Sequence, residues 1–463
     1  MSEPPRFGPS DLICMLLVVG LAAGTRVGYV VNAGATQPAF AVQGQTPAWV
    51  MPGENGPQAQ TELEDLTQHL REERRFACRA PLSTHVETTA HVAPGYPWLV
   101  SLAGRIQDDP APLMRWVQCG LGALTALCYF FFARRAFAST LVGALAGLLA
   151  AFYPFWIVNT AELADGVVTT FLLAAALALG TRGSQAGGAF TSVAFGLALA
   201  ALAMVRAALL PFAVVAFVWY LARCRETRTG WFAGLLALLG FANGLAPWAL
   251  RDWREFSEPL PIVDSAYLHL WMGNNPRATG SALGEDELRR SLGKELSESL
   301  VAETDQPRRY ARLGPELLEQ VRTDPSAALG HRLDAGASFV LGGHWFSKER
   351  TLAIKQGEAD DDAEPHPRLL ESVEPALRAS LLIVLLLGAL GWRWSAAWAH
   401  HGRLGALAMV WVPLPYLLSH AENLSGPRLP LDGVLLCYTA FALACFGPGF
   451  VRRPDERAEV EAT

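Results

Sequence analysis

The sequence lacks the short motifs that identify many nucleotide-binding proteins, hydrolases and metalloenzymes. It contains no G-x-x-x-x-G-K-[ST] loop, no G-x-G-x-x-G turn before a strand, no H-E-x-x-H helix and no G-x-S-x-G elbow. None of its seven cysteines forms a Cys-x-x-Cys pair, so the sequence indicates neither a zinc site nor a disulfide. We therefore expect no metal, no cofactor and no nucleic-acid partner.

Charged residues are scarce over long stretches of the chain. Apolar residues make up 51% of the 463 residues, and they gather into runs separated by short Arg-bearing loops. Since a helix needs about 20 apolar residues to cross roughly 30 Å of hydrocarbon, the runs predict an all-α polytopic membrane protein with about ten transmembrane helices. The predicted spans are Leu12–Val31, Leu113–Phe132, Thr140–Val158, Gly166–Gly180, Ala189–Val205, Ala207–Ala222, Trp231–Leu250, Leu377–Trp394, Leu404–His420 and Leu431–Phe450.

The placement of arginine orients these spans. If the N-terminus is cytoplasmic, two large loops, residues 33–112 and 251–376, lie outside, and the short inner segments carry Arg134, Arg135, Arg182, Arg223, Arg225, Arg228, Arg393, Arg403, Arg452 and Arg453. Residues 251–375 carry 23 acids against 15 bases, a net charge of −8. Basic inner loops and an acidic outer loop fit the positive-inside pattern, so we expect a multi-pass protein of the bacterial inner membrane with both loops in the periplasm. The expected divisions are an N-terminal module 1–250, a helical loop domain 251–376, C-terminal spans 377–450 and a cytoplasmic tail 451–463.

Both outer loops contain amphipathic helices. In the first loop, Leu63, Leu66 and Leu70 fall on one helical face. This predicts a helix on the membrane surface, with a small soluble subdomain as the alternative. In the second loop, leucines recur every four residues from Leu288 to Leu300, which predicts helices that pack a small core of their own.

The candidate site residues of the first loop lie close to its end. Glu87 and His91 precede Pro94-Gly95-Tyr96-Pro97, which we expect to form a stiff turn that dips at the membrane face. If the stretch is helical, His91 lies one turn after Glu87. The alternative for Tyr96 is an interfacial anchor at headgroup depth.

Further candidates lie at the outer ends of the spans. Arg251 and Arg428 could hold a phosphate, because a guanidinium is planar and always charged; for Arg428, snorkelling to the headgroups is the alternative. Asn274 belongs to a predicted Gly-Asn turn. Glu162 starts the fourth span, and Arg206 divides a 35-residue apolar stretch that is too long for one crossing; ionisable groups at such depths usually face a cavity or each other.

In order along the chain, these segments resemble the glycosyltransferase-C superfamily, and most closely its bacterial protein O-mannosyltransferase and aminoarabinose-transferase branch. That branch has Pro-Gly-Tyr-Pro before its second span, and this chain has Pro94-Gly95-Tyr96-Pro97. The branch has Pro-Trp-x-x-Arg-Asn and then a Gly-Asn turn, and this chain has residues 247–252, with Asp252 in place of Asn, and then Gly273-Asn274. Of the family's Arg-Tyr-Arg-x-Pro segment, Arg428-Leu429-Pro430 remains.

The resemblance implies sugar transfer from a polyprenyl-phosphate donor to a lipid, glycan or protein acceptor. It implies that a first-loop carboxylate deprotonates or orients the acceptor hydroxyl, and that Arg251 and Arg428 stabilise the departing phosphate. The family's usual first-loop Asp aligns with Ala59-Gln60, so Glu87, followed by Glu62 and Asp65, is the expected replacement. A non-catalytic relative that binds a lipid-linked sugar or a partner protein is the main alternative. A transporter fits less well, because the second outer loop is large.

Overall fold

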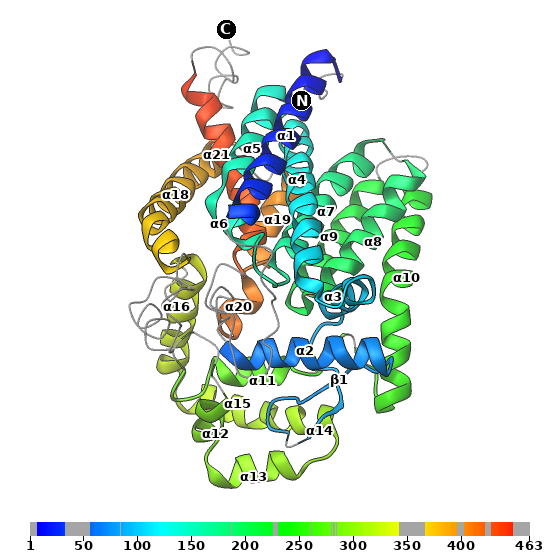
Figure 1. Cartoon of the computed structure of the whole chain (residues 1–463), viewed down its shortest axis with the longest axis vertical. Coiled ribbons are helices and arrows are strands. Elements are labelled where there is room, and N and C mark those ends of the chain that lie inside the picture. The colour runs from blue at the N-terminus through cyan, green and yellow to red at the C-terminus, as the bar shows by residue number, and fades with distance from the viewer. Residues whose placement is uncertain are drawn as a thin grey trace.

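The computed structural model describes residues 7–32, 56–83, 85–186, 188–225, 230–260, 262–278, 280, 283, 285–341, 366–395, 402–421 and 427–447. Long helices run side by side in one half of the molecule, and short helices gather at the other end (Figure 1). The bundle consists of α1 (Pro9–Asn32), α4 (Pro110–Ala136), α5 (Thr140–Phe152), α6 (Pro154–Asn159), α7 (Gly166–Ala186), α8 (Ala189–Val205), η1 (Ala207–Leu209), α9 (Leu210–Cys224), α10 (Gly230–Phe256), α18 (His366–Trp394), α19 (Arg403–Trp411), α20 (Leu414–Leu418) and α21 (Leu429–Phe446).

The helix lengths and compositions support the predicted membrane fold. Within the described ranges, five helical segments are long and apolar enough to cross a membrane, and four shorter apolar segments accompany them. Each of the ten predicted spans overlaps one or more helices, and the last three residues of Leu431–Phe450 lie outside the described residues. This is an all-α polytopic membrane fold. The five long segments are Pro9–Asn32, Pro110–Ala136, Ala207–Cys224, Gly230–Phe256 and Leu429–Phe446.

Breaks between helices lie where the sequence has proline or a buried charge. α8 ends at Val205 and Arg206 adopts an extended backbone (φ −141°, ψ 97°), which confirms the predicted break. α5 and α6 are separated at Tyr153, directly before Pro154, because a residue before proline is pushed out of the helical region. Pro247, by contrast, lies inside α10, and the helix continues to Phe256 rather than ending at Leu250 as predicted.

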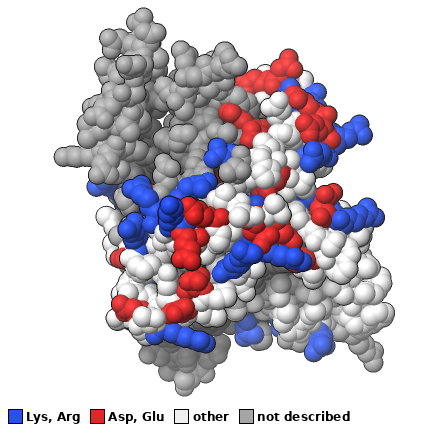
Figure 2. Space-filling view, turned by 90° about the horizontal axis from the view of Figure 1, so that it is seen from below, with Lys and Arg blue, Asp and Glu red and all other residues white. Residues whose placement is uncertain are grey.

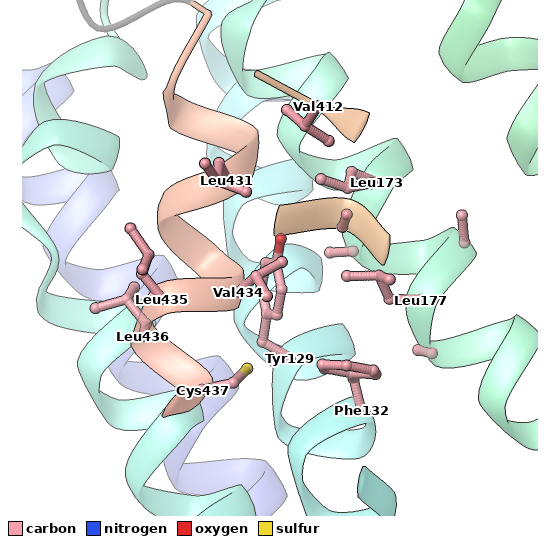
Figure 3. Close-up of a cluster of buried hydrophobic side chains, with 14 of the residues drawn as sticks. Tyr129, Phe132, Leu173, Leu177, Val412, Leu431, Val434, Leu435, Leu436 and Cys437 are labelled. Carbon is pink, nitrogen blue, oxygen red and sulfur yellow. The ribbon is translucent and has the colours of Figure 1, made fainter. Parts of the chain in front are cut away.

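The core of the bundle forms around α21. This helix is buried on nearly all sides, and Figure 3 shows Val434 and Cys437 beside Tyr129 of α4. The hydroxyl of Tyr129 donates to the carbonyl of Pro430 at 3.1 Å. A helix that is apolar all round must be surrounded by other helices or by lipid. In the described bundle, α21 is the central helix and is surrounded by other helices.

The second loop folds as a helical layer at the end of the bundle away from the start of α1 and the end of α21 (Figure 1). Leu268, Trp271, Leu288, Leu300 and Leu313 form its core, as the four-residue spacing predicted. Its helices are α11 (Ala266–Met272), α12 (Glu285–Leu292), α13 (Lys294–Ala302), α14 (Gln306–Ala311), α15 (Leu313–Thr323) and α16 (Pro325–Leu341).

The first loop packs onto this layer and onto the bundle. Its helix α2 (Gly56–Glu72) lies beside α3 (Gly95–Ile106). Leu66 packs with Phe76 and Cys78, so the apolar face of α2 contacts protein, whereas we expected a membrane surface. The predicted stiff turn at residues 94–97 is instead the start of α3, since proline fits the first helical turn. Gly95 allows the start of α3 to lie close to the end of α8, because a Cβ there would collide with the backbone of Met204 and the side chain of Val205.

Candidate functional site

A short hairpin positions the polar residues of the first loop. Strands β1 (Ala77–Cys78) and β2 (Glu87–Thr88) pair antiparallel, so Glu87 lies in a strand and not in the helical stretch that would place His91 one turn away. After β2 the chain is fixed to the second loop, where the backbone N–H of Asp264 donates to the carbonyl of Ala90 (3.1 Å). The hydroxyl of Ser265 donates to the carbonyl of His91 (2.8 Å). The hairpin therefore delivers His91 to the junction of the two loops.

Glu62 and His91 meet at this junction. The Oε2 atom of Glu62 lies 3.5 Å from Nε2 of His91, and their side chains are 24% and 5% exposed. Asp65 follows three residues later on the same side of α2, and its carbonyl lies 2.7 Å from Nδ1 of His69. Of the three first-loop acids expected to serve as a base, Glu62 is thus the one seen in contact with a buried imidazole.

Glu87 occupies a different environment. Its two carboxylate oxygens accept hydrogen bonds from Arg309 of α14 at 2.6 and 3.1 Å. The Arg309 side chain is only 1% exposed and also donates to the carbonyl of Glu303. A bidentate pair of this kind fixes two segments firmly, so Glu87 joins the first loop to the second.

Arg251 closes the same region from α10. Its guanidinium donates to the carbonyl of Thr89 (2.9 Å) and to Asp252 (2.7 Å), and it stacks over Trp248 at 4.7 Å from the ring centroid. Arg251 is thus bonded directly to the first loop.

Asp264 and two histidines were not among the sequence candidates. Neither oxygen of the buried Asp264 carboxylate has a hydrogen-bond partner among the described residues, and burial raises its pKa to about 7. Nδ1 of His269 and Nε2 of His420 lie 3.0 Å apart, and burial lowers the pKa of His269 to about 4. Single polar residues at the edges of apolar runs were the only sequence signal for these groups.

The junction also reaches the end of α20. Asn274, in the predicted turn, donates to the carbonyls of Leu270 (2.6 Å) and Leu418 (3.2 Å). Arg332 of α16 donates to the carbonyls of Gly273 and Leu418. The first loop, the second loop and the segment before Arg428 thus converge. Within the described ranges, no three His, Cys, Asp or Glu side chains are placed to hold a metal ion.

Arg428 is buried rather than at an exposed edge. Its side chain is 4% exposed, pairs with Asp432 (3.0 Å) and donates to the carbonyl of Val340 (2.6 Å). Tyr153 donates to the other oxygen of Asp432 at 2.8 Å. The charge of Arg428 is therefore part of a buried network between α16, α21 and the loop before α6, and Arg428 does not snorkel to the headgroups in this structure.

Tyr96, Glu162 and Arg206 gather where α3 packs against α4 and α8. Tyr96 is buried and donates to Gln118 (3.1 Å), whose amide donates to the carbonyl of Glu162 (2.7 Å). Arg206 forms a two-point ion pair with Asp165. Tyr96 is therefore no headgroup anchor in this structure, and Arg206 meets an acid, as ionisable groups at such depths usually do.

A buried arginine inside the bundle was also overlooked from sequence. Arg26 of α1 donates to the carbonyls of Ala22, Ala150 and Ala151 and lines a cavity of about 10 Å³ together with Thr125 and Asn159. That volume suits one water molecule. The position of Arg26 within the apolar run Leu12–Val31 was the sequence feature that could have indicated a buried polar group.

The comparisons with known proteins agree with this architecture. A family model described as dolichyl-phosphate-mannose-protein mannosyltransferase matches residues 91–246. The oligosaccharyltransferase AglB from Archaeoglobus fulgidus, solved with an inhibitory peptide and a dolichol-phosphate, superposes with a TM-score of 0.53 and 12% identity, over 98% of this chain and 52% of that one. The chain has the glycosyltransferase-C fold.

Further comparisons set the limits of this assignment. A second glycosyltransferase-C structure, the Archaeoglobus fulgidus oligosaccharyltransferase tethered to an acceptor peptide, gives a TM-score of 0.51 and 14% identity over 94% of this chain and 49% of its own. The alignment with ArnT from Cupriavidus metallidurans covers 90% of this chain and 78% of ArnT at 13% identity. Its TM-score is 0.34. The chain spans about half the length of the oligosaccharyltransferases it matches. No curated protein matches the sequence.

Proposed function

We propose that this protein is a membrane glycosyltransferase that moves a sugar from a polyprenyl-phosphate donor to a lipid, glycan or protein acceptor. We place the reaction at the periplasmic face of a bacterial inner membrane. The observation that carries the proposal is the Glu62–His91 pair, buried where both outer loops of a glycosyltransferase-C fold meet. The mannosyltransferase family model, which begins at His91, supports the reaction class.

The chemistry needs one base and one means of stabilising the leaving group. The acceptor oxygen attacks the anomeric carbon of the sugar and forms the new C–O bond, while the bond from that carbon to the phosphate oxygen breaks. The electron pair leaves with the lipid phosphate, and the acceptor proton passes to the Glu62 carboxylate. Arg251 donates to the carbonyl of Thr89, two residues before His91, and we assign it to the phosphate charge.

The geometry favours Glu62 over Glu87 as the base. A carboxylate that accepts from Arg309 with both oxygens has its charge compensated by a buried guanidinium. Glu62 keeps partial exposure and faces an imidazole rather than a guanidinium. Glu87 is therefore assigned to the support of the loops, and Asp65 remains the second candidate.

Glu62→Gln and Glu87→Gln form a matched pair that tests this assignment. Membranes containing each variant are incubated with undecaprenyl-phosphate mannose, glucose or aminoarabinose, and the release of undecaprenyl phosphate is measured. We expect Glu62→Gln to lower release at least 100-fold with an unchanged melting temperature, since general bases contribute roughly 10²–10⁴-fold. Glu87→Gln should lower the melting temperature instead. Wild-type turnover in Glu62→Gln would refute the assignment, and no release by the wild type from any donor would favour a non-catalytic binding protein.

A further inference from the structure

His91 is held by a hydrogen-bond chain that begins in the second loop. Gln306, the first residue of α14, donates from Nε2 to the hydroxyl of Thr89 at 2.8 Å. That hydroxyl lies 2.7 Å from Nδ1 of His91 and also accepts from the His91 backbone N–H at 3.2 Å. Gln306 and Thr89 are both buried. A buried chain of this kind leaves few ways to place its hydrogens.

The orientation of the Gln306 amide is fixed by the backbone. The N–H of Ala90 donates to Gln306 Oε1 at 3.1 Å, and a backbone N–H can only donate. The oxygen of the amide must therefore face Ala90, and its NH₂ group must face Thr89. This decides an assignment that heavy-atom positions alone leave open.

The hydrogen of Thr89 then has one place to go. A hydroxyl has two acceptor positions and one hydrogen. Both acceptor positions are used, by Gln306 Nε2 and by the His91 backbone N–H, so the hydroxyl donates to Nδ1 of His91. Nδ1 therefore carries no hydrogen, and the ring hydrogen lies on Nε2, which faces Glu62.

We infer that Gln306 and Thr89 are positioning residues: they hold His91 as its Nε2–H tautomer, so that the ring donates to Glu62 and orients this carboxylate. The role of Glu62 as the base rests on the proposed function. One carboxylate oxygen is then held by a neutral donor, and the other is left to accept the proton of the acceptor hydroxyl. The 3.5 Å separation is longer than a formed hydrogen bond, and such contacts tighten when substrate binds.

This arrangement makes the first-loop base depend on the second loop. Glu62 lies on α2 and His91 follows β2, but the side chain that sets the ring tautomer comes from α14. The Glu87–Arg309 pair joins the same two segments, since Arg309 also lies on α14. Gln306 of the second loop thus acts on Glu62 only indirectly, through Thr89 and His91.

Nitrogen NMR of the intact protein in nanodiscs tests the tautomer directly. The protein is labelled with ring-¹⁵N histidine, and the His91 signals are identified by their loss in His91→Gln. We expect a protonated Nε2 and an unprotonated Nδ1 in the wild type. Thr89→Val and Gln306→Leu should introduce the Nδ1–H form, whereas Thr89→Ser should keep the wild-type pattern. A wild-type Nδ1–H ring, or a Thr89→Val spectrum identical to the wild type, would overturn the inference.

Kinetics separate positioning from a merely structural role. With the undecaprenyl-phosphate sugars named above, Thr89→Val should lower kcat roughly tenfold or more with little change in KM, and Thr89→Ser should restore it. Thr88→Val and Gln68→Leu remove neighbouring polar groups that do not belong to the hydrogen-bond chain from Gln306 to His91, and serve as controls. A changed tautomer with unchanged kcat would refute the positioning role. A wild type that fixes the tautomer but releases no lipid phosphate would refute the proposed function alone.

Discussion

At the scale of single residues, the buried ionisable groups of the loop junction make stability depend on pH in two opposite ways. The folded protein keeps a proton on Asp264 up to about pH 7, whereas an unfolded chain loses it near pH 4. Its contribution to stability therefore falls as the pH rises from about 4 through about 7. His269 titrates near 4 when folded, so its contribution falls as the pH drops from about 6.5 through about 4.

Asp264→Asn tests the acidic half of this behaviour. The amide cannot ionise, so at pH 8 the free energy of unfolding of the variant should exceed that of the wild type by on the order of a few kcal/mol. The variant should therefore unfold at a higher temperature. At pH 4 most of the advantage should disappear, because the wild-type carboxyl is then neutral in the folded state and only about half ionised in the unfolded chain. Differential scanning fluorimetry in detergent across this range provides the measurement, and a difference that does not vary with pH would contradict the expectation.

The Arg428–Asp432 pair gives a second prediction at this scale. Arg428→Gln leaves a buried carboxylate without its cation, and breaking such a pair typically costs about 3–5 kcal/mol. The double variant Arg428→Gln/Asp432→Asn removes both charges and should unfold at a higher temperature than the single variant. Thermal unfolding of purified protein compares the two. If the single and double variants are equally stable, the pair does not act as a compensated unit.

At the scale of helices, α8 and α10 cross closely because both present glycine at the contact. A Cβ on Gly196 would collide with the carbonyl of Ala237, and one on Gly240 would collide with the carbonyl of Val193. Glycine lets two backbones approach where larger residues would hold them apart. The pairing of these helices therefore depends on two positions that carry no side chain.

Gly240→Val should separate the two helices. Overpacking of this kind typically costs about 1–3 kcal/mol, which should appear as a lower melting temperature and a lower yield of folded protein in detergent. Gly120→Val is the control, because no atom lies within 4 Å of the position a Cβ would take there. Equal losses in both variants would attribute the effect to helix propensity instead of packing.

Helical elements were more predictable than the site, because the residues that determine each helix and its ends are neighbours in the sequence. Apolar runs and the charge of Arg206 were sufficient to place spans and a break. The start of α3 was mistaken for a turn, since Pro94 and Pro97 suit both a turn and a first helical turn. The contacts that decide the site are long-range: nothing near Glu87 in the sequence indicates Arg309, and nothing near His91 indicates Gln306.

At the scale of the whole molecule, α1 begins and α21 ends at one end of the bundle, and both loop layers lie at the other (Figure 1). Seen from that loop end, acidic and basic side chains are interspersed over the face (Figure 2). This arrangement is the one that the arginine pattern predicts for termini in the cytoplasm and loops in the periplasm.

Cysteine labelling tests that orientation in intact cells. A cysteine at the exposed Glu298 in α13 should react with a membrane-impermeant maleimide from outside. A cysteine at Arg225, directly after α9, should react only once the cells are opened. The chain's seven native cysteines are replaced by serine first. Labelling of position 225 from outside would reverse the topology.

The junction at His91 also has a consequence for how the protein is made. Its groups come from α2, from the segment after β2, from α14 and from the end of α20. During synthesis Glu62 leaves the ribosome well before Gln306 and His420 are translated, and in the proposed topology it also crosses the membrane before them. An unfinished chain therefore holds its acid without the partners that orient it, and the site is completed only when the last helices insert. Under the proposed function, donor lipid is protected from wasteful hydrolysis by nascent protein.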